Sequence, residues 1–135
     1  MARLNYILIV DDDEASNLIT RLFLEKADVT DQIHVRMNGV EAVAFIMQHM
    51  NALPELILLD INMPLMDGFE FLRRWKANGL TGKSKIVMYT SSGREADIAH
   101  AKQYEDVVAY IEKPMSMAKI NQLLDAVFGQ HRSGS

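Results

Sequence analysis

The sequence contains no cysteine, which excludes disulfide bonds, thiolate zinc sites and iron–sulfur clusters with cysteine ligands. It has no long apolar run either, because the longest, at residues 42–47, is far too short to span a bilayer. The first residues lack the apolar stretch of a signal peptide. Basic residues are outnumbered, with 14 Lys and Arg against 18 Asp and Glu, which argues against a nucleic-acid-binding surface. We therefore expect a cytoplasmic protein that binds neither membranes nor nucleic acid.

The composition is that of a single soluble domain with a sizeable core. The chain has 135 residues, of which 49% are hydrophobic and 24% are charged. Short apolar segments recur, each separated from the next by enough chain for a turn, a helix and a return. These predicted strands lie at residues 6–10, 33–35, 56–59, 86–89 and 107–111.

The segments between and after these strands have helical periodicity. Helices are predicted at residues 15–23, 40–47, 69–75, 96–103 and 117–128. In the first helix the apolar residues recur at the spacing of one helix face: Ala15, Leu18, Ile19, Leu22 and Phe23. Asn38 with Glu41, and Ser92 with Glu95, predict capping boxes, and Ser116 predicts the N-cap of the last helix.

Alternation of strands and helices predicts the fold class. Five such units on one domain favour an α/β fold, in which a doubly wound parallel sheet of five strands has order 2-1-3-4-5 and five helices cover both faces. In sheets of this order, ligands bind beyond the carboxyl ends of the strands, at the switch point between strands 1 and 3.

Acidic residues follow both strands that meet at this switch point. Asp11, Asp12 and Asp13 come directly after the first strand, and Asp60 comes directly after the third. Crowded carboxylates repel one another unless a cation joins them, and hard oxygen ligands suit Mg²⁺. The sequence therefore predicts a Mg²⁺ site built mainly from Asp12 and Asp60, with Asp11 nearby and acting through water.

Two further strand ends reach the same rim of the sheet. The fourth strand ends at Thr90, which supplies a hydroxyl, and Lys113 follows the fifth strand and supplies an ammonium group. A carboxylate nucleophile, a metal, a hydrogen-bond donor and a compact positive charge are the groups needed to form an acyl phosphate.

Four motifs in this order resemble the receiver domain of two-component response regulators. They are ILIVDDD at residues 7–13, LLDINMPLMDG at 58–68, VMYTS at 87–91 and YIEKP at 110–114. The resemblance covers residues 4–128, and the fold that it implies is the flavodoxin-like sheet predicted above. The polar, aperiodic residues 129–135 are expected to form a disordered tail, of the kind that cloning can add.

The resemblance implies a role for each matched acidic position. Asp60 resembles the phosphoacceptor, which takes a phosphoryl group from a sensor histidine kinase or a histidine phosphotransfer protein in phosphorelay signalling. Asp11 and Asp12 resemble the pair that holds Mg²⁺ together with Asp60, and Asn62 would add its backbone carbonyl to the metal.

The other matched positions imply a conformational switch. Thr90 resembles the hydroxyl that moves to the phosphoryl oxygens, and Tyr110 resembles the aromatic that swings inward with it. Lys113 would pair with the phosphoryl group, and the bond between Lys113 and Pro114 is expected to be cis. The surface of the fourth helix, fifth strand and fifth helix would then bind an unidentified downstream protein.

Two other functions remain open alongside this one. The first is a receiver-fold interaction module that is not phosphorylated, although such proteins tend to lose the phosphoacceptor aspartate or the lysine. The second is an aspartate-nucleophile phosphohydrolase, which needs a second acid two residues after the nucleophile, where this chain has Asn62. On the main reading the protein is not an enzyme, beyond catalysing its own phosphorylation and dephosphorylation.

Overall fold

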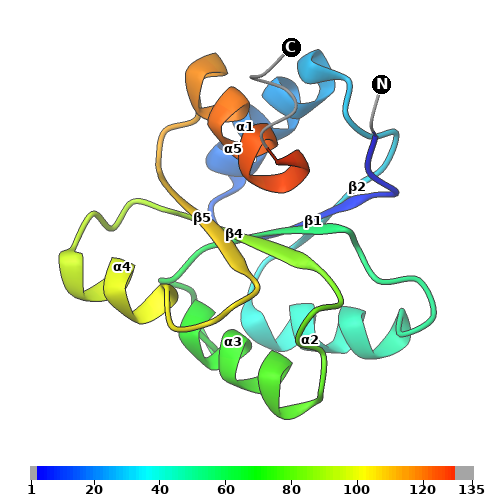
Figure 1. Ribbon diagram of the computed structural model, residues 1–135, viewed down its shortest axis with the longest axis vertical. Helices are drawn as coiled ribbons and strands as arrows, with labels where there is room; N and C mark the ends of the chain where they lie inside the picture. Colours follow the sequence, from blue (N-terminus) through cyan, green and yellow to red (C-terminus); the bar gives the residue numbers. More distant parts are fainter. Residues whose placement is uncertain (1–2, 130–135) are drawn as a thin grey trace.

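A computed structural model describes residues 3–129 and contains one parallel sheet between two layers of helices (Figure 1). All but the first residue of the expected tail at 129–135 lies outside the described residues. The elements are β1 (Ile7–Val10), α1 (Glu14–Ala27), β2 (Ile33–Arg36), α2 (Gly39–Gln48), β3 (Leu56–Leu59), α3 (Gly68–Ala77), β4 (Lys85–Thr90), α4 (Glu95–Ala101), β5 (Val107–Glu112) and α5 (Met117–Phe128). The predicted α/β class with five strands and five helices is confirmed.

The sheet order is β2-β1-β3-β4-β5, as predicted, and all pairings are parallel. α1 and α5 cover one face, and α2, α3 and α4 cover the other (Figure 1). Both central strands β1 and β3 are buried along their whole length, because successive side chains enter the cores on opposite faces. In the part of the chain described, no helix combines the length and the apolar character that a membrane span needs.

Two of the predicted helix starts are confirmed. Asn38 caps α2, where its side chain accepts a hydrogen bond from the backbone N–H of Glu41 at 2.9 Å. Ser116 caps α5, where its hydroxyl accepts from the N–H of Lys119 at 3.2 Å. Each cap satisfies one of the backbone donors that the first turn of a helix leaves free.

The predicted capping box of Ser92 with Glu95 is wrong. The N-cap of α4 is Arg94, which makes no side-chain capping bond. The hydroxyl of Ser92 instead donates to the carboxylate of Asp97 at 2.6 Å. In a capping box the Ser92 hydroxyl would accept from the N–H of Glu95, but here it accepts from the N–H of Arg94 at 3.4 Å, because the helix begins two residues later than the pattern requires.

α1 is a helix as predicted, but most of its apolar stripe faces outward, and only Phe23 is half-buried against the core. The exposed fractions are 60% for Leu18, 43% for Ile19 and 56% for Leu22. The buried residues of α1 are Asn17, Thr20 and Leu24, which also share one helix face. The helix therefore turns a face of mixed polar and apolar residues inward and exposed apolar side chains to the surroundings.

The turn between α4 and β5 is held by Asp106, at the end of the sheet remote from the acidic residues. Its carboxylate accepts from the indole N–H of Trp75 on α3 at 2.8 Å, and from the backbone N–H of Gly82 at 3.0 Å. Gly82 has a φ of 89°, a conformation that favours glycine. One side chain thus links α3, the loop before β4 and the start of β5.

We expect replacement of Asp106 by Ala to lower the free energy of unfolding by about 1–3 kcal/mol, because the indole N–H of the buried Trp75 would lose its acceptor. Urea denaturation followed by far-ultraviolet circular dichroism measures the change. Replacement of the exposed Glu105 by Ala is the control and should leave the midpoint nearly unchanged. Equal midpoints for the wild type and the Asp106→Ala variant would contradict the prediction.

Candidate functional site

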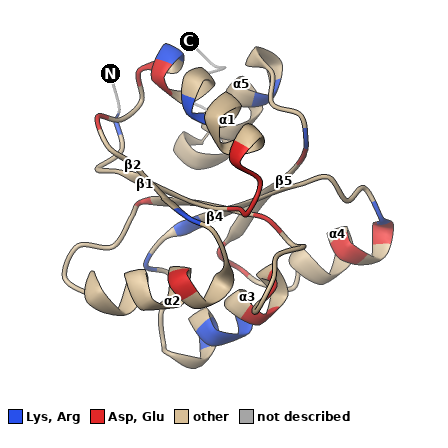
Figure 2. Cartoon of the chain, turned by 180° about the vertical axis from the view of Figure 1, so that it is seen from behind, with Lys and Arg blue, Asp and Glu red and all other residues tan. Residues whose placement is uncertain are grey.

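Carboxylates from two neighbouring strands meet at the carboxyl edge of the sheet. β1 and β3 are paired with Val10 opposite Leu59, so the residues that follow them, Asp11 and Asp60, emerge side by side. The carboxylate oxygens of Asp11, Asp12 and Asp60 can all lie within 4.8 Å of one another. Figure 2 shows this acidic segment where the chain leaves β1 for α1.

The three carboxylates differ in their exposure to solvent. Asp11 is 1% exposed and Asp60 is 6% exposed, whereas Asp12 lies open at the surface. Burial raises the pKa of Asp11, because a low-dielectric environment disfavours its charged form. Three hard oxygen donors with one open side fit a divalent cation, which would neutralise the charges that burial disfavours.

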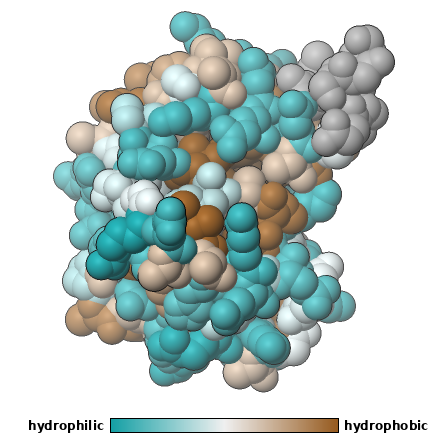
Figure 3. Space-filling view, turned by 60° about the vertical axis from the view of Figure 1, so that its left-hand side comes forward, coloured by the Kyte–Doolittle hydropathy of each residue, from teal (hydrophilic) through white to brown (hydrophobic). Residues whose placement is uncertain are grey.

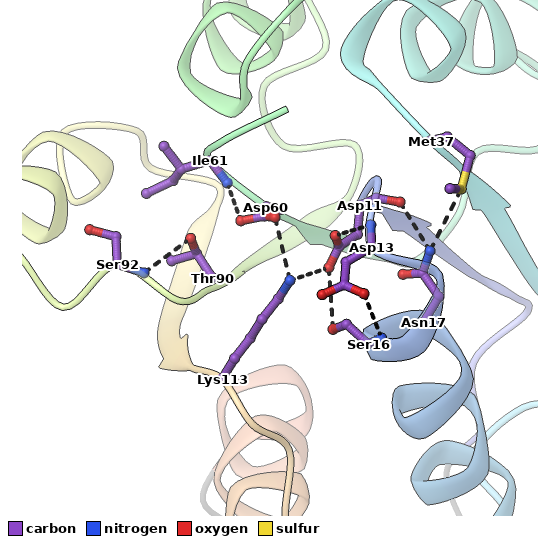
Figure 4. Close-up of polar contacts among 10 residues, drawn as sticks. All are labelled: Asp11, Asp13, Ser16, Asn17, Met37, Asp60, Ile61, Thr90, Ser92 and Lys113. Carbon is purple, nitrogen blue, oxygen red and sulfur yellow. Dashed lines mark hydrogen bonds and ion pairs between the residues drawn. The ribbon is translucent and has the colours of Figure 1, made fainter. Parts of the chain in front are cut away.

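Lys113 lies between the two buried carboxylates (Figure 4). Its Nζ is 2.7 Å from Oδ2 of Asp11 and 3.4 Å from Oδ2 of Asp60. Burial acts to lower the pKa of Lys113, but the hydrogen bond from its Nζ to Asp11 and the charges of Asp60 and Asp11 outweigh it and raise the pKa. The ammonium group is therefore a firmly charged counterion within the site. The Lys113–Pro114 peptide bond is cis, as expected from the resemblance.

Backbone groups hold both buried carboxylates in place. The N–H of Asp13 donates to Oδ1 of Asp11 at 2.9 Å, and the N–H of Ile61 donates to Oδ1 of Asp60 at 2.7 Å (Figure 4). Gly68, at the start of α3, packs so tightly that a Cβ there would lie 2.3 Å from the carbonyl oxygen of Asp60. The absence of a side chain at Gly68 thus lets α3 begin directly behind the Asp60 backbone.

Thr90 and Tyr110 lie beside this site but make their contacts through Ser92. Thr90 is fully buried at the end of β4, and its Oγ1 accepts from the N–H of Ser92 at 3.3 Å. The hydroxyl of Tyr110 donates to the carbonyl oxygen of Ser92 at 2.8 Å. Burial raises the pKa of Tyr110, so its hydroxyl is a proton donor at neutral pH.

The structure places most of the predicted residues together and adds two that the sequence did not reveal. Asp11, Asp12, Asp60 and Lys113 form one cluster, whereas the side chain of Asn62 is exposed. Of the two additions, Asn17 donates from Nδ2 to the carbonyl oxygen of Asp11 at 3.0 Å, and Asp97 binds the hydroxyl of Ser92. A polar residue in the first turn of a helix usually serves the helix itself, so no sequence signal marked either one.

Comparison with known proteins decides the family. The chain matches the response regulator receiver domain over residues 7–125. It belongs to this family.

Two curated relatives illustrate the range of this family. The chain is 31% identical to a probable C4-dicarboxylate response regulator of Priestia megaterium over 127 residues, which are 94% of this chain and 51% of that protein. It is 30% identical to a probable chemotaxis protein CheY of Rhizobium etli, covering 91% of this chain and 92% of the relative. The chain therefore spans about half the length of the first relative and nearly all of the second.

Solved receiver structures share the fold. A two-component response regulator from Cytophaga hutchinsonii superposes with a TM-score of 0.85 at 25% identity, covering 93% of this chain and 98% of the other. The phosphorylated cyanobacterial phytochrome response regulator RcpA gives 0.76 at 28% identity, covering 97% and 96%. The Mn²⁺-bound response regulator Rcp1 gives 0.72 at 28% identity, covering 94% and 96%.

We expect replacement of Lys113 by Met to strengthen the binding of a divalent cation. The ammonium group competes with the cation for Asp11, so its removal should raise the affinity for Mg²⁺ or Mn²⁺ severalfold, up to about tenfold, which corresponds to about 1.4 kcal/mol. Isothermal titration calorimetry at fixed ionic strength measures this affinity.

The control is Lys102→Met, which removes one exposed positive charge at the end of α4. It should leave cation affinity unchanged. Cation binding by Lys113→Met that is equal to, or weaker than, that of the wild type would contradict the competition.

Proposed function

We propose that this receiver domain accepts a phosphoryl group on Asp60 from a phosphohistidine of a sensor histidine kinase or histidine phosphotransfer protein. The observation that carries the proposal is the position of Oδ2 of Asp60, which lies within a carboxylate cluster suited to a divalent cation and 3.4 Å from the Lys113 ammonium group. The carboxylate oxygen attacks phosphorus, the phosphorus–nitrogen bond breaks, and the imidazole leaves with the electron pair of that bond.

Each side chain of the cluster has a part in this transfer. Asp60 is the nucleophile, and its burial limits access of water to the acyl phosphate. Lys113 stabilises the charge that develops on the phosphoryl oxygens. Asp11, Asp12 and Asp60, with the backbone carbonyl of Asn62, would hold Mg²⁺, which supplies charge neutralisation for the incoming phosphoryl group.

Relatives of this protein support both the phosphorylation and the binding of a divalent cation in this proposal. A phosphorylated response regulator and a Mn²⁺-bound one share this fold and are 28% identical to the chain. A phosphohydrolase receives less support, because the position two residues after Asp60 is Asn62, which offers no carboxyl group for general acid–base catalysis. An unphosphorylated interaction module would have no need for the pairing of Lys113 with two buried carboxylates.

Phosphorylation would be read out at the surface of α4, β5 and α5. The acyl phosphate adds charge and acceptor oxygens next to Thr90, whose hydroxyl moves toward them, and Tyr110 follows. The outer surface of these elements carries exposed apolar side chains at Val108 and Met117, with exposed fractions of 36% and 44%. A downstream protein would bind there and respond to the change.

We expect Asp60→Asn to abolish phosphorylation, because an amide cannot form the acyl phosphate. The wild type and variant are incubated with acetyl phosphate and Mg²⁺, and intact mass spectrometry detects one added phosphoryl group. The matched control is Asp13→Asn. Asp13 lies two residues from Asp11 and caps α1, and asparagine is an equally good cap, so this substitution should leave both α1 and the phosphorylation unchanged. Phosphorylation of the Asp60→Asn variant at the wild-type rate would refute the assigned nucleophile.

The phosphodonor protein would approach over the exposed apolar face of α1. Leu18, Ile19 and Leu22 lie on the helix that starts at the acidic rim, so a partner that packs on them can bring its phosphohistidine to Asp60. Figure 3, which turns the α4 side of the molecule forward rather than α1, shows a mostly hydrophilic surface with some hydrophobic atoms exposed near its centre.

We expect the double substitution Leu18→Asn and Leu22→Asn to slow transfer from a phosphorylated histidine-containing donor protein at least tenfold, while phosphorylation by acetyl phosphate is unchanged. Transfer of radiolabelled phosphate from the donor measures the first rate. The control is Met47→Asn with Met50→Asn, which removes two exposed apolar side chains at the end of α2 and in the turn that follows it. If both double variants accept phosphate from the donor equally fast, α1 is not the docking face.

A further inference from the structure

A hydrogen-bond network outside the acidic site is centred on Asp97. This residue lies in the first turn of α4 and is only 9% exposed. Its Oδ2 accepts from the hydroxyl of Ser92 at 2.6 Å, and from Nε and Nη2 of Arg94 at 3.1 and 3.0 Å. The hydrogen bond from Ser92, and then the interactions with Arg94, lower the pKa of Asp97. It is a charged, nearly buried carboxylate that phosphoryl transfer does not use.

This network takes the place of a helix cap. α4 has seven residues, and its N-cap Arg94 makes no side-chain capping bond. The bond between Ser92 and Asp97 therefore attaches the beginning of α4 to the loop that leaves β4. A charge-assisted hydrogen bond in a partly buried setting is stronger than one between neutral groups, so this attachment resists movement of the loop.

Ser92 connects the same carboxylate to both switch residues. Its N–H donates to Oγ1 of Thr90 at 3.3 Å, a contact drawn in Figure 4. Its carbonyl oxygen accepts from the hydroxyl of Tyr110 at 2.8 Å. Three polar groups of one residue thus reach β4, β5 and, through Asp97, α4.

The fixed position of Ser92 opposes the movement that the proposed function requires. The hydroxyl of Thr90 is engaged with Ser92, so a displacement of Thr90 toward a phosphoryl group on Asp60 must either stretch this bond or carry Ser92 with it. Ser92 cannot follow without loosening its bond to Asp97. Each such interaction adds to the free energy of the switched conformation relative to the resting one.

We propose that Asp97 is a positioning residue that restrains the β4–α4 loop through Ser92 and so weakens the response of Thr90 to a phosphoryl group. This proposal rests on the proposed function of Asp60. A ligand that binds the switched conformation binds more tightly when that conformation is less costly, so removal of the restraint should raise the affinity for a phosphoryl analogue.

The test is a titration with beryllofluoride in the presence of saturating Mg²⁺. Calorimetry and the fluorine NMR signal of the bound ligand measure the binding affinity. We expect Asp97→Ala to bind about three- to tenfold more tightly than the wild type. Ser92→Ala, which removes the other end of the same bond, should give a similar gain, and the double variant should gain no more than either single one. Asp97→Asn keeps an acceptor for the Ser92 hydroxyl and should restore affinity toward the wild-type value.

The control is Asp106→Ala, which removes a carboxylate with similar bonding at the opposite end of the sheet and should leave the affinity unchanged. Unchanged or weaker binding by both Asp97→Ala and Ser92→Ala overturns the restraint, as do additive gains in the double variant. If Asp97→Ala does not fold, Ser92→Ala decides alone. Failure of the proposed function is distinct, because the wild type itself would then bind no beryllofluoride.

Discussion

The ammonium group of Lys113 makes the acidic rim of the sheet possible. Asp11 and Asp60 are almost fully buried at the ends of adjacent strands, and two such carboxylates without a counterion would repel one another. Lys113 contacts both and so ties β5 to β1 and β3 at the edge where the three strands end. The same contact occupies a carboxylate that a divalent cation would share. The protein's own charge therefore neutralises the carboxylates only in part, and a divalent cation would have to share Asp11 with Lys113.

The rest of the site holds these carboxylates through the backbone. The N–H groups of Asp13 and Ile61 bind one oxygen each of Asp11 and Asp60, which leaves the other oxygen of each directed at Lys113. Gly68 lets α3 start in direct contact with the backbone of Asp60. The strand register places these donors, because Asp13 and Ile61 follow the paired ends of β1 and β3.

The parts of the fold that depend on local pattern could be predicted from the sequence. The strand at residues 56–59 and the helix at 117–128 have the predicted bounds. A strand buried on both faces has a continuous apolar run, and a helix buried on one face has apolar residues at helical spacing. The acidic cluster followed from the strand order, because the ends of adjacent parallel strands share one edge. Motifs also indicated Lys113, which the structure places within the cluster.

Features that depend on tertiary contacts were not predictable. The apolar spacing on α1 identified a helix, but not that Asn17 and Thr20 would be buried on its inward face beside Leu24. In the same way, Ser92 matched a capping pattern with the exposed Glu95, while its hydroxyl bonds the nearly buried Asp97. Hydrophobic periodicity reports that a stripe exists; what covers it is decided by neighbouring elements.

The lone tryptophan gives this protein an optical probe at a defined place. Trp75 is 4% exposed, and its indole N–H is bound to Asp106, at the start of the strand that ends beside Lys113. Indole emission depends on the charge and polarity around the ring. Trp75 fluorescence therefore monitors the end of β5 remote from the acidic cluster. A response of its emission to a ligand at Asp60 would be a direct optical measure of how far along β5 the effect of that ligand extends.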